Sequence, residues 1–218
     1  MDGSTARSPS SHFIVHFTHV SNLPGILAAG CIQSDKLVGR GLGLQVEAAD
    51  LGIKASRRTI PVPLAPFGYV ADYVPFYFAS RSPMLYKIFR GGLPNYTEGQ
   101  DPLIYLVSTV EAVVQAGLPW LFSDGNCAAT VTQVFDDLSQ LDIVVDWQVM
   151  RAQMWNNTAE DPDRMRRRMA EFLVHERIPV GCLAGVVVRT HALKQQVEAI
   201  LAAYHSRLRV RVQPGWYF

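Results

Sequence analysis

The pattern of apolar and polar positions predicts short, separate strands. Residues 13–18 and 103–107 form continuous apolar runs rich in β-branched and aromatic side chains, as buried strands do. Residues 207–212 instead alternate arginine with leucine or valine, which is the period of a half-buried strand. Further strands are expected at 74–79, 120–122, 171–174 and 183–188.

Helices are predicted where capping residues precede an apolar pattern. Asn22 and Ser82 are candidate N-caps for helices at 23–29 and 84–89, and Gly30 would end the first of these. Strands and helices follow no regular alternation, so we predict an α+β fold with a bent, largely antiparallel central sheet and flanking helices. The remaining helices are expected at 109–116, 128–138, 161–169 and 191–204.

Two segments stand apart from this pattern. Residues 1–11 are small and polar, and we expect them to form a flexible leader. Residues 40–68 are rich in glycine and proline, with a possible helix at 46–55, and we expect a loop-rich insertion there. A connection of this length is more often functional than idle. The length of 218 residues then suits one domain over residues 12–218.

Composition and charge narrow the class of protein. The chain is 49% hydrophobic and 18% charged, which supplies a packed core and excludes a disordered tail. Its formal net charge of +1 is too small to attract the whole protein electrostatically to nucleic acid. Any nucleic-acid binding must therefore depend on a local patch.

The sequence also indicates a compartment. It has no apolar run of about 18 residues and no apolar region near the N-terminus, so we expect neither a membrane span nor secretion. Cys31, Cys127 and Cys182 are scattered and form no CxxC pair, which fits a reducing environment better than a disulfide framework. We expect a cytoplasmic protein.

Several well-defined motifs are absent. The chain has no GxGxxG, no GxxxxGK[ST], no HExxH and no GxSxG, so the common dinucleotide, phosphate, zinc-protease and serine-hydrolase sites have no support. His16 and His19 would point to opposite faces of a strand, and no cysteine lies near them in sequence. We expect no metal.

Three groups of residues are candidates for chemistry. Glu171 begins a predicted buried strand, where a carboxylate can have its charge and orientation tuned for catalysis. His16 and Asn22 lie where a strand meets a helix, which suits an amide or phosphate ligand, although a core histidine and an ordinary cap is the alternative. Arginines beside aromatic residues suit single-stranded nucleic acid, although a solvated arginine-rich face is equally compatible with the composition.

A set of short motifs in a fixed order resembles the DarT family, the toxins of DarT–DarG toxin–antitoxin systems. The similarity extends over residues 13–218, and although each motif is weak alone, their order is specific. The motifs are His16-Phe17-Thr18-His19 with Asn22-Leu23, Arg57-Arg58, Val74-Pro75-Phe76-Tyr77, Arg81-Ser82-Pro83-Met84-Leu85-Tyr86, Ser123-Asp124-Gly125-Asn126, Trp155-Asn156-Asn157-Thr158, and Arg167-Arg168-Met169-Ala170-Glu171-Phe172-Leu173-Val174.

The resemblance implies an ADP-ribosyltransferase fold, NAD+ as co-substrate, and thymine in single-stranded DNA as the target, modified in a short sequence context. It also implies a partner, the antitoxin DarG, whose macrodomain removes the modification. A related branch of the family modifies guanine. The alternatives are an ADP-ribosyltransferase that acts on RNA or protein, and a non-catalytic nucleic-acid-binding domain that has kept the fold.

The resemblance also assigns roles to individual residues. Glu171 matches the catalytic glutamate, and Arg57 or Arg58 matches a functional arginine, with Arg57 favoured. Asn126 departs from the histidine that some members carry in this turn, so the assisting role of that histidine is not carried over. The residues expected to contact NAD+ are His16, Thr18, Asn22, Leu23, Met84 and Tyr86. The residues expected to contact DNA are Tyr73, Tyr77, Trp155, Asn156, Arg164, Arg166, Arg167, Arg168, Arg207, Arg209 and Arg211.

Overall fold

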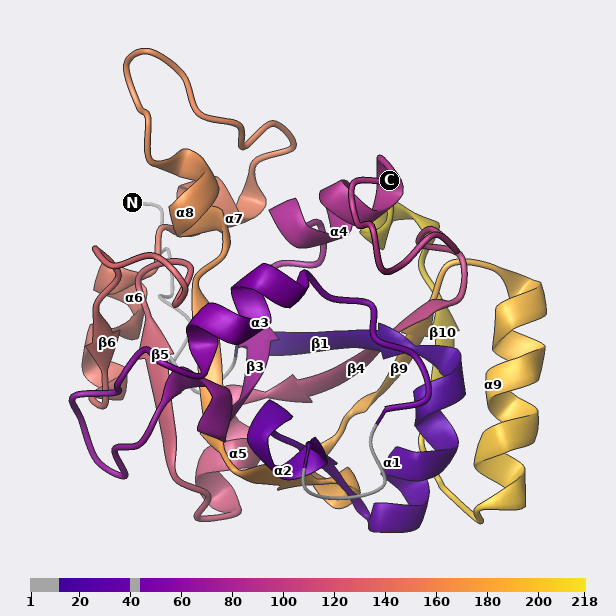
Figure 1. Ribbon diagram of the computed structural model, residues 1–218. Coiled ribbons are helices and arrows are strands. Elements are labelled where there is room, and N and C mark those ends of the chain that lie inside the picture. The colour runs from indigo at the N-terminus through magenta and orange to yellow at the C-terminus, as the bar shows by residue number, and fades with distance from the viewer. Residues whose placement is uncertain (1–11, 40–43) are drawn as a thin grey trace, which may run out of the picture.

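The structure, a computed structural model that describes residues 12–39 and 44–218, is organised around a large sheet (Figure 1). The strands are β1 (Phe13–His19), β2 (Cys31–Gln33), β3 (Tyr73–Tyr77), β4 (Leu103–Thr109), β5 (Trp120–Ser123), β6 (Val134–Phe135), β7 (Glu171–His175), β8 (Arg177–Pro179), β9 (Gly185–Val188) and β10 (Val210–Val212). Eight of them form the main sheet in the order β10-β9-β4-β1-β3-β7-β5-β6, and β2 pairs with β8.

Pairing within the main sheet is antiparallel except between β9 and β10, which run parallel. The prediction of a largely antiparallel sheet is therefore confirmed. In the middle of the sheet β3 pairs with β7, and this register sets Tyr77 opposite Glu171. The first residue of β7 thus lies at the end of β3, beside the loop that leads to the next helix.

The helices lie around the sheet (Figure 1). They are α1 (Leu23–Ala29), α2 (Asp35–Val38), α3 (Leu51–Arg57), α4 (Pro83–Phe89), α5 (Val110–Gln115), α6 (Leu141–Val144), α7 (Trp147–Arg151), α8 (Arg164–Arg168) and α9 (His191–Ala203). Figure 1 shows α1 and α9 side by side at one end of the molecule, where they are in contact. Ser82 caps α4 as predicted, because its hydroxyl accepts a hydrogen bond from the Leu85 N–H.

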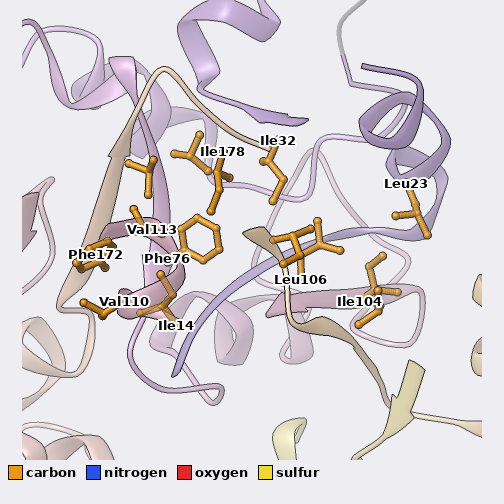
Figure 2. Packing of buried hydrophobic residues seen from close by; sticks show 14 of the residues in the cluster. Ile14, Leu23, Ile32, Phe76, Ile104, Leu106, Val110, Val113, Phe172 and Ile178 are labelled. Atoms are coloured by element: carbon orange, nitrogen blue, oxygen red, sulfur yellow. The ribbon is translucent and has the colours of Figure 1, made fainter. Parts of the chain in front are cut away.

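Both faces of the sheet are covered by apolar side chains. Successive residues of a strand point to opposite faces, so Ile14 packs into one cluster and Val15 into another. Figure 2 shows part of the larger cluster, in which Phe76 and Phe172 from neighbouring strands meet Val113 of α5. The opposite face leaves room for a cavity next to β1 and β3, as described below.

The predicted helix at 128–138 is wrong. This segment makes turns and then the short strand β6, in which Phe135 pairs with Phe122. Its Thr130, Val131 and Val134 are β-branched, which disfavours a helix, and the edge of β5 offers a partner for a strand. The predicted strand at 207–212 is shorter than expected, because only residues 210–212 pair with β9.

The leader expected at 1–11 lies outside the described residues, so the predicted division into leader and domain stays a prediction. The insertion expected at 40–68 contains α3, which begins and ends later than the helix predicted at 46–55. Within the described part of the chain, no helix is long and apolar enough to cross a membrane.

Candidate functional site

A cavity of about 530 Å³ opens between the middle of the sheet and the insertion. Strands β1 and β3 form its floor through His16, Thr18 and Tyr77, and α3 contributes Arg57 from the other side. Met84, in the first turn of α4, lies at one edge. Its volume falls within the range of about 300–1,000 Å³ that is usual for small-molecule sites.

Glu171 is completely buried, with 0% of its surface exposed. Its carboxylate accepts hydrogen bonds from Arg57 Nη1, at 2.9 Å to each oxygen, and from the Cys127 N–H at 3.1 Å. The Ser123 hydroxyl fixes the backbone of the same residue by accepting from the Glu171 N–H at 3.0 Å. A carboxylate held in this way has a fixed orientation and a charged partner.

Arg57 comes from the last turn of α3. Asp50 caps this helix by accepting from the N–H groups of Gly52 and Ile53, which fixes the direction in which Arg57 leaves it. Burial opposes the charge of the guanidinium, but the neighbouring Glu171 carboxylate raises the pKa of Arg57, so the guanidinium remains charged. The second terminal nitrogen, Nη2, is buried and has no hydrogen-bond partner among the described residues.

The adjacent Arg58 points elsewhere. It is exposed, and its Nε donates to the Asp35 carboxylate at 2.8 Å. The structure therefore separates two neighbours that the sequence left as alternatives: Arg57 meets Glu171 at the cavity, and Arg58 makes a surface ion pair. This placement agrees with the preference for Arg57.

His16 lies on the floor of the cavity. Its Nδ1 is 2.8 Å from the Pro75 carbonyl oxygen, so a neutral ring donates its proton there and leaves Nε2 as an acceptor. Burial lowers the pKa of His16, the bond to Pro75 opposes this effect, and the charge of Arg57 lowers the pKa further. The ring is therefore neutral at pH 7.

This pKa predicts how stability depends on pH. Below about pH 6.5 an unfolded histidine takes up a proton that folded His16 does not bind until its own lower pKa is reached. The free energy of unfolding should therefore fall by up to about 1.4 kcal/mol per pH unit in this window. Asp35, Asp50 and Asp72 have pKa values lowered from 3.8 and titrate outside it.

Urea unfolding at pH 7.5 and 5.5 tests this prediction. The His16→Gln variant should lose less stability over this range than the unmodified protein. The exposed His191 offers a matched control, and His191→Gln should show the full loss. An equal loss in His16→Gln and the unmodified protein would contradict a neutral, buried His16.

Comparison with known proteins identifies the family. The model of the family "ssDNA thymidine ADP-ribosyltransferase, DarT" matches residues 15–218. The chain belongs to the DarT family. The DNA ADP-ribosyl transferase of Thermus sp. (strain 2.9) is 35% identical over 207 residues, which are 94% of this chain and 95% of the relative.

Solved structures of a relative agree with this assignment. Thermus sp. 2.9 DarT in complex with ADP-ribosylated ssDNA matches with a TM-score of 0.89 and 33% identity, over 98% of this chain and 99% of that one. The same protein in complex with NAD+ matches with a TM-score of 0.85 and 32% identity, over 98% and 100%. A more distant relative, a DNA ADP-ribosyl transferase–DNA ADP-ribosyl glycohydrolase fusion protein of Thermosipho africanus, is 22% identical over 96% of this chain and 50% of the fusion.

These matches confirm the resemblance to DarT and the α+β, ADP-ribosyltransferase-like fold expected from it. They also confirm the expected class of enzyme, an ADP-ribosyltransferase that uses NAD+. The roles of individual residues are a separate matter, and the structure places these residues in different surroundings.

The DarT resemblance assigned six residues to NAD+, and four of them line the cavity: His16, Thr18, Asn22 and Met84. Leu23 does not, because it is fully buried in the apolar cluster beneath α1. Tyr86 does not line it either, and its ring packs on Phe218.

Asn22 does not cap helix α1 with its side chain, as the sequence suggested. Instead its amide donates to the Thr18 hydroxyl and to the Val46 carbonyl, and its carbonyl accepts from the N–H groups of Gln45 and Val46. Asn22 therefore ties the segment before α3 to the cavity floor.

Other bonds that hold this segment were not predicted. Lys54 of α3 makes ion pairs with Asp35 and with Glu47, and Lys87 of α4 pairs with Asp50 at 2.5 Å. The partners of the Lys54–Asp35 and Lys87–Asp50 pairs are distant in sequence, so no local motif predicts these two pairs. Together they fix α3, and with it Arg57, over the cavity.

The aromatic residues expected to contact DNA are mostly covered. Tyr73 is 1% exposed, and its hydroxyl donates to the Phe67 carbonyl at 2.8 Å, so the structure gives it a core position and not the expected stacking surface. Trp155 is 7% exposed and also lacks a free face, whereas the neighbouring Asn156 is exposed. Tyr77 lines the cavity and lies opposite Glu171 in the strand register.

The arginines of α8 do not form the expected basic patch. Arg166 is paired with Asp163 and Asp124, and Arg167 with Asp146 and Asp161. Arg164 donates to the Met154 carbonyl at 2.9 Å.

Arg168 is buried, and its guanidinium donates to the carbonyl groups of Val149, Met150 and Ala152 at the end of α7 and to that of Arg81. Burial lowers its pKa to about 10. Its role in the structure is therefore to join α7, α8 and the start of α4. Because the guanidinium of Arg168 is buried, it is not available for the expected contact with DNA.

Arg207, Arg209 and Arg211 are exposed, as the alternating pattern predicted. They lie on or next to β10, which forms one edge of the main sheet, whereas the cavity lies at its middle. Their contact with DNA stays a prediction.

Within residues 12–39 and 44–218, no group of three or more histidine, cysteine, aspartate or glutamate side chains could hold a metal ion.

The side-chain carbonyl of Asn126 accepts a hydrogen bond from the Ala128 N–H at 2.9 Å. This bond shapes the turn in which the Cys127 N–H donates to Glu171.

Proposed function

We propose that the protein transfers ADP-ribose from NAD+ to thymine in single-stranded DNA, in a sequence-dependent manner, and acts as the toxin of a toxin–antitoxin pair. The observation that carries the proposal is the buried carboxylate of Glu171, which is held by Arg57, a residue that lines the cavity. The matching family is that of ssDNA thymidine ADP-ribosyltransferases, and Thermus sp. 2.9 DarT forms complexes with NAD+ and with ADP-ribosylated ssDNA.

The residues around the cavity suit NAD+. The Arg57 guanidinium carries a positive charge and a buried, unpartnered Nη2 that can donate to an oxygen of the bound substrate. The neutral His16 offers an acceptor, and Met84 and Ile53 offer apolar surface. A ligand with sugars, phosphates and flat rings needs this mixture of contacts.

The reaction replaces one N-glycosidic bond by another. The bond between nicotinamide and ribose breaks, nicotinamide leaves with the bonding electrons as a neutral molecule, and positive charge develops on the sugar as in glycoside cleavage. The Glu171 carboxylate stabilises that charge electrostatically. Thymine N3 then bonds to the sugar carbon and gives up its proton, and Glu171, aided by Arg57, is the base we assign to that proton.

This chemistry requires an unpaired base. In a duplex the N3 atom of thymine lies in the base pair, and taking the base out of the stack costs a few kcal/mol. The neighbours of Glu171, Arg57 and Tyr77, line a cavity between the sheet and α3. We therefore infer that the enzyme acts on strands that are already single.

The proposed partner is a DarG antitoxin whose macrodomain removes the modification. In the Thermosipho africanus relative a DNA ADP-ribosyl glycohydrolase is fused to the transferase, so one chain of that protein combines addition and removal. Because the proposed target is the cell's own DNA, we place the reaction in the cytoplasm.

Labelled NAD+ tests the proposal. We would incubate the protein with a panel of single-stranded DNA oligonucleotides, the RNA versions of the same sequences, and a mixture of proteins. The proposal expects label on thymine-containing DNA alone. Label on RNA or protein, without label on DNA, would replace it by a transferase with another target, and no consumption of NAD+ would leave only a binding domain.

A further inference from the structure

Four aromatic rings gather on the outer side of α4. Tyr86 and Phe89 lie three residues apart and so share a face of the helix, with ring centroids 6.2 Å apart. Phe218 packs against both, at 5.1 Å from Tyr86 and 5.8 Å from Phe89, and Trp155 meets Tyr86 edge-on at 5.9 Å. We call this group the aromatic platform.

The platform has a covered side and an open side. Trp155 is buried, whereas Tyr86 is 41% and Phe89 45% exposed. The inner rings therefore hold the outer two in place while part of each outer ring faces solvent. Exposed aromatic rings that are fixed from behind lose little conformational entropy when a flat ligand stacks on them.

The segment that carries α4 is basic. Residues 73–97 contain no aspartate or glutamate, but they contain Arg81, Lys87 and Arg90. Lys87 pairs with Asp50, and the guanidinium of Arg81 lies over the Phe218 ring at 5.2 Å. Arg90 follows the last turn of α4, is exposed, and has no ion-pair partner in the described part of the chain.

The platform and the cavity share helix α4. Met84 lines the cavity from the first turn of α4, and Phe89 ends the same helix. With a rise of about 1.5 Å per residue, the two are about 7.5 Å apart along the axis. A strand whose target base reaches Glu171 past Met84 would bring a neighbouring nucleotide to Tyr86 and Phe89. Figure 1 shows α4 on the same side of the molecule as the projecting loop between α7 and α8.

We infer that the aromatic platform binds a base next to the target thymine by stacking on Tyr86 and Phe89, with the strand's phosphates near Arg90. This inference rests on the proposed function and gives Tyr86 a role in binding DNA, in place of the contact with NAD+ that the sequence suggested. Stacking on a ring accepts any base, because every base has a π face. The platform therefore contributes affinity at a neighbouring position, not a choice of base there.

Kinetics of ring removal test the inference. Base–aromatic stacking contributes about 1–3 kcal/mol per base, which corresponds to about 5- to 150-fold in affinity. Tyr86→Ala and Phe89→Ala should each raise the KM for single-stranded DNA by at least about fivefold, whereas kcat at saturating DNA and the KM for NAD+ should change less than about twofold. Tyr86→Phe and Phe89→Tyr keep the rings and should retain the original KM. Ile143, an exposed residue of α6, offers a matched control, and Ile143→Ala should have no effect.

A double-mutant cycle makes the test specific. An oligonucleotide with an abasic nucleotide on one side of the target thymine removes the stacking partner from the DNA. If the base stacks on the ring, Tyr86→Ala should have little further effect on this oligonucleotide, because the two changes remove one interaction. Effects that multiply independently on both sides of the target would overturn the inference.

The outcomes separate the platform from the proposed function. If the unmodified protein labels no DNA, the proposed function fails and the platform with it. If it labels single-stranded DNA but Tyr86→Ala and Phe89→Ala keep the original KM for DNA, the platform alone is wrong. A higher KM for NAD+ in Tyr86→Ala, with an unchanged KM for DNA, would return Tyr86 to the site of NAD+.

Discussion

Replacing Glu171 by glutamine should lower kcat for ADP-ribosyl transfer by at least about 10³-fold. The glutamine amide has almost the same size and still accepts a hydrogen bond from Arg57, but it carries no negative charge to stabilise the sugar and cannot take the proton from thymine. Removing one oriented donor from an active site costs about 10²–10³ in kcat, and here a full charge and a base are lost together.

The fold should survive this change. Glutamine keeps the volume of Glu171, and Phe172, Leu173 and Val174 continue to hold β7 in the sheet. Circular dichroism and thermal unfolding would check this. Glu111→Gln on the surface of α5 is a matched control that should keep full activity. Activity close to normal in Glu171→Gln would remove this residue from the mechanism.

The adjacent arginines should behave very differently. Arg57→Lys should reduce kcat/KM by about 10²-fold or more, whereas Arg58→Lys should stay within about threefold of the original. A lysine at position 57 can keep the charge beside Glu171, but it has a single nitrogen. Arg57 holds both carboxylate oxygens with Nη1 and keeps Nη2 as a second, free donor. Arg58 makes only an exposed pair with Asp35, of a kind that contributes little.

Lysine is preferable to alanine in this comparison. Removing one member of a buried ion pair leaves the other charge unpaired, at a cost of about 3–5 kcal/mol, so Arg57→Ala could fail by unfolding. Transfer rates and melting temperatures measured for both lysine variants separate catalysis from stability. Equal losses in the two variants would contradict the assignment of Arg57 to the site.

Local sequence signals predicted the frame of the site. The apolar runs of β1, β4 and β7 are long enough to identify these strands, and the cap at Ser82 with the following proline fixes the start of α4. The resemblance to DarT made Glu171 and Arg57 candidates for the site, and these two residues, far apart in sequence, meet only in the folded chain.

The errors have a common physical cause, which is that charge and aromaticity do not reveal burial. The arginines of α8 suggest a nucleic-acid surface, yet their carboxylate partners Asp124 and Asp146 come from distant segments. Tyr73 and Trp155 suggest stacking surfaces, yet tertiary packing covers both. Asn22 resembles a helix cap, but its side-chain carbonyl accepts hydrogen bonds from the N–H groups of Gln45 and Val46 instead.

No sequence pattern predicts that Cys127 donates a hydrogen bond to Glu171. Its contribution is a backbone N–H aimed at Glu171, and any residue except proline has such a group. The turn at Asp124-Gly125 was recognisable, but its position against β7 depends on the pairing of β5 with β7.

The most direct test of the central claim locates the product. An oligonucleotide with one thymine in a varied sequence context would be incubated with NAD+, alone and annealed to its complement, and mass spectrometry would identify the modified base. The account predicts one ADP-ribose on thymine in the single strand, little or none in the duplex, and a rate that depends on the neighbouring bases. Equal modification of single strand and duplex, or an adduct on guanine, would contradict it.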